Sequence, residues 1–160
     1  MAGNGGELKE YRQKILTALI NNRDICELVL NRSVPVITAD IQDELTNNHI
    51  FKYAFVPNVQ DDEKTFIAFE INGRTSNNTN LYKNISLSFF IFSHANVIKH
   101  KTGHLRTDLI DECVQDLFNE NKDFGVGLMY CTEDSYLKVS NEYYGRQLTF
   151  KVKDMNVSRC

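Results

Sequence analysis

The sequence lacks features on which several classes of protein depend. It has no basic excess, because 18 Lys and Arg stand against 21 Asp and Glu and give a formal net charge of −3 at pH 7. This excludes a positive field over the whole surface for holding nucleic acid, although a local basic patch stays open. No apolar run approaches the roughly 20 residues of a membrane-spanning helix, so we expect no membrane partner.

Cysteine is scarce and has no metal-binding or disulfide spacing. The four cysteines are Cys26, Cys113, Cys131 and Cys160, and none forms a CxxC pair. The first residues, MAGNGGELKEYR, have no apolar core of the kind a secretion signal needs. We therefore expect reduced thiols in a cytoplasmic setting. A chain of 160 residues suits one domain, which we place at residues 1–160 with a flexible N-terminus at 1–6.

The hydrophobic pattern predicts helices and strands in alternating groups. Helical spacing from Leu8 to Ile20 precedes DICELVLN, which either continues that helix or forms a second one. Thr38 is positioned to cap a short helix over residues 38–45. Strands are expected at residues 64–71, 84–92, 123–131 and 146–154, with a helix from Thr107 to Phe118 before the last two.

These elements together predict an α+β fold. Residues 64–71 and 84–92 each alternate with one clean apolar face and one mixed face, which is typical of a sheet covered on one side only. We expect a single mixed or antiparallel sheet of four or more strands, with the helices packed on one face. In the helix from Thr107 to Phe118, Thr107 is expected to be the N-cap, and Asp111 is expected to face solvent.

The segment SFFIFSHANVIKHKTGHLRTDLIDECVQDLF, residues 88–118, contains a basic loop rich in histidine. His94, His100 and His104 raise the possibility of a metal, but Gly103 interrupts helical spacing and no Glu follows the first histidine. The loop's further positive residues invite a contact with phosphates, which would be independent of sequence. A solvated connector is the third interpretation. The residues concerned are Lys99, His100, Lys101, His104 and Arg106.

Catalytic motifs are absent from the sequence. There is no GxSxG elbow, and DFGVG lacks the third glycine and the following helix of a dinucleotide fingerprint. A small metal-dependent hydrolase or nuclease that uses the histidine loop at 94–104 stays as the alternative function. We expect no enzymatic activity and no cofactor.

One loop-like stretch is too apolar for a free linker. Residues 49–59 mix turn formers with Phe51, Tyr53, Phe55 and Val56. Such side chains are expected to pack on this protein or on a partner.

The order of elements and several local phrases resemble phage tail-terminator and head–tail joining (neck) proteins. The similar parts are an N-terminal amphipathic helix, a hairpin ending in SLSFFIFSH, then GHLRTDLIDECVQDLF and DFGVGLMYC. The resemblance implies a structural virion subunit, made in the host cytoplasm, that forms a homo-oligomeric ring, commonly a hexamer. The ring would cap the tail tube, meet neck and connector proteins, and let DNA pass. Phe51, Tyr53, Phe55 and Val56 would then form an inter-subunit arm, and the basic histidine loop would face DNA or a partner.

Overall fold

The computed structural model describes residues 4–54, 63–75, 82–123 and 128–155. Its helices are α1 (Asn4–Ile20), α2 (Arg23–Leu30), α3 (Ala39–Asn48) and α4 (Arg106–Phe118). Its strands are β1 (Ile50–Phe51), β2 (Thr65–Thr75), β3 (Tyr82–His94), β4 (Tyr130–Lys138) and β5 (Tyr143–Met155). No helix in these described parts is long and apolar enough to cross a membrane.

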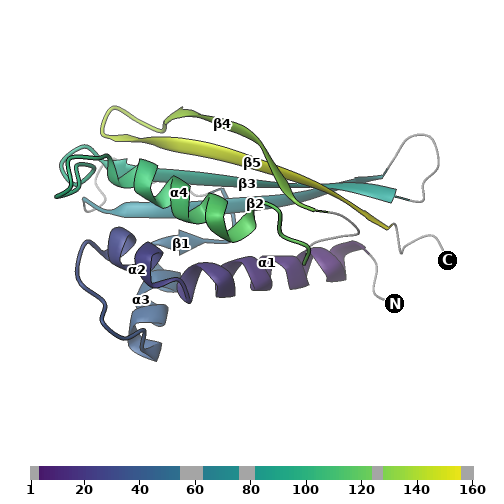
Figure 1. The fold of residues 1–160 in the computed structure, drawn as a ribbon, viewed down its shortest axis with the longest axis horizontal. Helices are drawn as coiled ribbons and strands as arrows, with labels where there is room; N and C mark the ends of the chain where they lie inside the picture. Colours follow the sequence, from purple (N-terminus) through teal and green to yellow (C-terminus); the bar gives the residue numbers. More distant parts are fainter. Residues whose placement is uncertain (1–3, 55–62, 76–81, 124–127, 156–160) are drawn as a thin grey trace.

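The strands form one five-stranded sheet in the order β1-β2-β3-β5-β4. β1 is parallel to β2, and every other neighbouring pair is antiparallel. The helices all lie on one side of the sheet (Figure 1). The prediction of an α+β fold with a mixed sheet and helices on one face is therefore confirmed.

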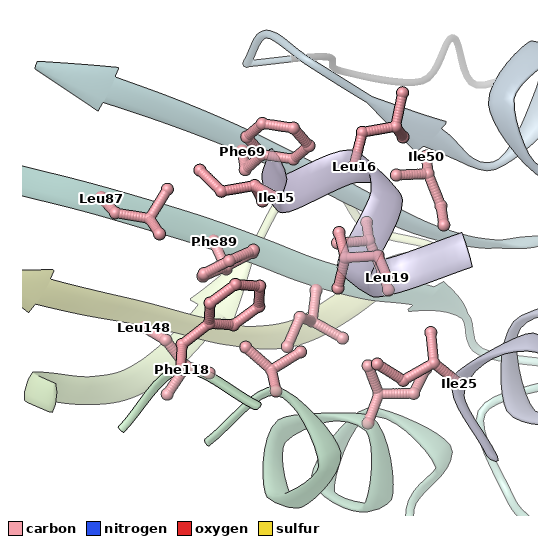
Figure 2. Close-up of a cluster of buried hydrophobic side chains, with 14 of the residues drawn as sticks. Ile15, Leu16, Leu19, Ile25, Ile50, Phe69, Leu87, Phe89, Phe118 and Leu148 are labelled. Carbon is pink, nitrogen blue, oxygen red and sulfur yellow. The ribbon is translucent and has the colours of Figure 1, made fainter. Parts of the chain in front are cut away.

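The core lies between the helices and the sheet. Ile15 and Leu19 of α1 point at Phe69 and Phe89 of the sheet, and Phe118 of α4 closes the same cluster (Figure 2). All five side chains are at most 1% exposed. Burying a side chain of this size stabilises the fold by about 1.5–3 kcal/mol. This one-sided burial leaves the opposite face of the sheet without a helix.

The helix boundaries follow from local capping. Asn22 accepts a hydrogen bond from the Ile25 amide at 3.0 Å, so DICELVLN starts a second helix and does not continue the first. Thr38 caps α3 by accepting from the Ile41 amide at 3.3 Å, as predicted. Helix α1 begins at Asn4, inside the range 1–6 that we expected to precede it.

Two expectations for α4 are wrong. The N-cap position is Leu105, which makes no side-chain capping bond, and Thr107 is 1% exposed inside the first turn. Asp111 is only 4% exposed, although its acidic side chain suggested a solvent-facing position. It occupies the buried stripe because Thr107, Ile110, Asp111 and Val114 share one helical face at i, i+3, i+4 and i+7 spacing.

The last pair of strands differs most from expectation. The strand predicted at residues 123–131 falls partly on residues outside the described ranges, and the strand that is described, β4, runs on to Lys138. β4 is the outer strand of its edge, and none of its residues is fully buried. Without a buried face it has no apolar alternation, which explains why the pattern missed it.

The face of the sheet opposite the helices carries a smaller aromatic cluster. Phe66, Phe92 and Tyr143 are buried there, with Phe66 and Phe92 stacked at 5.4 Å between ring centroids. Gly145 lies in the same row, and a Cβ at this position would lie 1.7 Å from the carbonyl oxygen of Ile91. Only glycine allows β5 to approach β3 this closely.

Candidate interaction surfaces

The basic loop between β3 and α4 is folded into a small hairpin. The His100 amide donates to the His104 carbonyl at 2.9 Å, and the Gly103 amide donates to the His100 carbonyl at 3.0 Å. Gly103 has φ +90°, a conformation that other residues rarely adopt, and this closes the turn. The hairpin presents Lys99, Lys101 and His104 to solvent.

The positive charge of this hairpin comes from lysine more than from histidine. Partial burial, and then the positive charges of Arg106 and Lys101, lower the pKa of His100 below its ordinary value. This lowered pKa favours the neutral form of His100. Lys99 and Lys101 remain as its exposed cations.

Arg106 does not belong to the exposed part of the loop, contrary to the grouping expected from the sequence. It is 3% exposed and joins the loop to α2. Its guanidinium donates to the carbonyls of Val97 at 2.9 Å and Leu28 at 2.8 Å, and to Asn31 Oδ1 at 2.7 Å. A cation at the C-terminal end of α2 also complements the helix dipole. Arg106 therefore positions the hairpin.

A groove of about 470 Å3 lies between α2, α4 and the hairpin. It is lined by charges of both signs, and several of them are already engaged. Arg32 is paired with Glu44, and Glu27 accepts from the Val34 amide at 3.1 Å. The thiol in the groove, Cys113, is a poor nucleophile because burial, and then neighbouring acids, raise its pKa to about 11.

The three histidines do not converge. Nδ1 of His94 accepts from the Asn96 amide at 3.1 Å, and its ring packs on Tyr143 at 5.2 Å between centroids. His100 and His104 lie instead on the hairpin. Within the described ranges, no three His, Cys, Asp or Glu side chains are grouped so that they would hold a metal ion.

The aromatic arm begins at the β1 edge of the sheet. Phe51 is half-buried and lies 5.8 Å from Tyr53 between ring centroids, and Tyr53 is 56% exposed. Arg12 holds this point of the chain, because it donates to the Lys52 carbonyl at 2.5 Å and to Glu70 at 3.0 Å. Phe55 and Val56, which we assigned to the same arm, lie outside the described residues.

Sequence reasoning missed a carboxylate cluster between α4 and the sheet, in which Asp111 is buried. Gln115 Nε2 donates to Asp111 Oδ1 at 2.6 Å, and Arg146 Nε lies 3.5 Å from Asp111 Oδ2. Arg146 makes shorter contacts with Asp134, at 2.9 and 2.6 Å. Burial, helped by the nearby Asp134, raises the pKa of Asp111 to about 6. The available signal was the position of Asp111 on the buried stripe of α4.

A family model named YomW matches residues 13–152 of the chain. No curated protein matches the chain. The matched range covers most of the sequence, from α1 to β5, and so includes the hairpin, the start of the arm and the carboxylate cluster. The chain belongs to the YomW family, whose name suggests a phage-associated protein.

Proposed function

We propose that this member of the YomW family is a structural protein of a phage virion, a tail terminator. Its copies form a ring, with a hexamer favoured, that caps the tail tube and joins it to the neck proteins. DNA passes through the central opening. The proposal combines the phage association suggested by the family name with the resemblance to tail-terminator and neck proteins.

The observation that carries the proposal is the one-sided packing of the fold. The helices cover one face of a long sheet and leave the other face without a helix (Figure 1). β3 and β5 have 13 residues each, or about 40 Å at 3.3 Å per residue. A ring subunit needs lateral surfaces for its neighbours and axial surfaces for other rings. A long sheet with distinct sides and ends supplies both.

Particular residues fit these roles. Tyr53 at the β1 edge is an exposed aromatic of the kind enriched at interfaces, which suits the lateral arm. The basic hairpin lies at one end of the sheet, and the Thr75 and Tyr82 ends of β2 and β3 lie at the other (Figure 1). Lys99 and Lys101 suit an axial protein contact or a sequence-independent contact with DNA. The hydrolase or nuclease alternative has no observation in its favour, since its three histidines point to different places.

The test is assembly on tail tubes. Purified protein is mixed with tail tubes that lack their terminator, and ring formation at the tube end is followed by electron microscopy. We expect Tyr53→Asp to raise the concentration for half-maximal assembly at least tenfold and to leave the melting temperature unchanged. Val36→Asp is the matched control, because Val36 is also exposed, at 68%, but lies outside the arm. Equal effects of both variants would contradict the role of the arm, and no ring for the wild-type protein would contradict the function.

A further inference from the structure

β4 presents a backbone edge that is open beyond Cys131, whose amide donates to Asn119 Oδ1 at 2.9 Å. It has nine residues and pairs, among the described strands, with β5 alone. Tyr130 and Tyr136 on this strand are 48% and 64% exposed. The unpaired N–H and C=O groups of such an edge form a template for another strand.

The hydrogen-bond pattern shows which residues of β4 point outward. The Val139 amide donates to the Tyr143 carbonyl at 3.0 Å, so this pair faces inward across the β4–β5 ladder. Inward and outward residues alternate along an antiparallel strand. In the register of β4 with β5, the backbone groups of Asp134, Tyr136 and Lys138 therefore point away from the sheet.

The opposite edge of the sheet is also open over part of its length. β1 pairs only with Ile67 and Ala68 of β2. The Ile67 amide donates to the His49 carbonyl at 2.8 Å, so the odd-numbered residues of β2 point toward this edge. Ile71, Gly73 and Thr75 lie past the end of β1, so no described strand pairs with them on this side, whereas β3 lies on their other side.

We infer that β4 of one copy pairs antiparallel with the Ile71–Thr75 edge of β2 in the next copy. This inference rests on the ring proposed above and assigns its lateral interface. Two features of the two edges fit each other: strand direction and hydrogen-bond phase.

The β4 and β2 edges match in strand direction and in hydrogen-bond phase without any change in the fold. β2 and β5 are both antiparallel to β3, and β4 is antiparallel to β5, so β4 opposes the direction of β2. On both edges the outward-pointing residues lie on the helix-covered side. Ile71 belongs to the core on that side, and Asp134 is registered with the core residue Leu148. Pairing the outward groups thus keeps the helix-covered faces of both copies on the same side.

The alternative occupant of the β4 edge is a second β4. A two-fold contact of β4 with itself, centred on Tyr136, would keep the hydrogen-bond phase and bring Asp134 opposite Lys138. It would leave the β2 edge unused, whereas a head-to-tail contact uses both edges and can close a ring.

Proline at Tyr136 tests the inference, because it removes an outward N–H and leaves the ladder with β5 intact. We expect Tyr136→Pro to fold but to need at least a tenfold higher concentration than Tyr136→Thr for half-maximal ring formation, measured by light scattering. Tyr136→Thr is the matched control, since it also removes the aromatic side chain but keeps the backbone N–H. Ser135→Pro removes an inward N–H and should lower the melting temperature instead.

Amide hydrogen exchange on the wild-type protein tests the same interface without any substitution. Ring formation should protect the amides of Asp134 and Tyr136, whereas the amides of Ser135 and Leu137 should be protected in monomer and ring alike. If Tyr136→Pro formed rings at the same concentration as Tyr136→Thr, the proposed interface would be overturned. Unprotected amides of Asp134 and Tyr136 in the ring would overturn it as well. Either result would leave the proposal of a ring standing. A wild-type protein that forms only a two-fold dimer, or no ring on tail tubes, would overturn the interface and the proposed function together.

Discussion

Replacing Asp111 with Asn should stabilise the protein at neutral pH. Asp111 is 4% exposed, and its pKa is raised from 3.8 to about 6. A pKa that is higher in the folded than in the unfolded state means that folding favours the protonated carboxyl. The stability that the protonated Asp111 carboxyl contributes is fully present below pH 3.8 and is lost as the pH rises through about 6.

The size of the effect follows from the shift. About two pKa units at 1.36 kcal/mol each correspond to roughly 3 kcal/mol as an upper estimate. Arg146 opposes this cost, but it is bound more closely to Asp134, at 2.6 Å, than to Asp111, at 3.5 Å. Burial and the neighbouring acid therefore outweigh the attraction to Arg146.

Urea denaturation of both proteins from pH 4 to pH 8 measures this difference. The free energy of unfolding of Asp111→Asn should exceed that of the wild-type protein by about 1–3 kcal/mol at pH 8, and the excess should shrink toward pH 4. Asp116→Asn on the exposed side of α4 is the control and should show no such pH dependence. A less stable Asp111→Asn at pH 8, or a difference that is constant with pH, would refute the reasoning.

Two further substitutions test the packing. Gly145→Ala should lower the free energy of unfolding in urea by more than about 3 kcal/mol, because the new Cβ would meet a β3 carbonyl oxygen at 1.7 Å. Gly103→Ala, with no atom within 4 Å of its Cβ, should lower it by only about 1 kcal/mol through its φ of +90°. Equal losses would contradict the account. Arg106→Met should cost about 2 kcal/mol in the same assay, because it leaves three part-buried acceptors, the carbonyls of Val97 and Leu28 and Asn31 Oδ1, without their donor. The exposed Lys101→Met should be within about 0.5 kcal/mol of wild type. A stable Arg106→Met would show that the hairpin does not depend on this anchor.

Sequence patterns predicted the parts of the fold in which burial and periodicity coincide. β2 and β3 alternate because one face of each packs on the helices, and Thr38 caps α3 through its own side chain. β4 escaped prediction because an edge strand without a buried face needs no alternation. The role of Arg106 was also hidden, since a buried arginine in a basic loop looks in sequence like its exposed neighbours Lys99 and Lys101.

The candidate surfaces were predictable only in part, for a related reason. The apolar composition of residues 49–59 predicted packing on this protein or on a partner, and the resemblance implied an arm that includes Tyr53. The structure places Tyr53 at an exposed edge of the sheet. The two open backbone edges have no side-chain signature, because main-chain groups carry the contact. The buried position of Asp111 could be predicted only from its place on the apolar stripe of α4. Its acidic side chain favoured a solvent-facing position instead.

The mass of the protein in solution, measured by light scattering alone and after addition of tail tubes, tests the central claim most directly. The account predicts a closed ring of identical subunits, with six copies favoured, either free or at the tube end. A monomer that stays a monomer in the presence of tail tubes would contradict it.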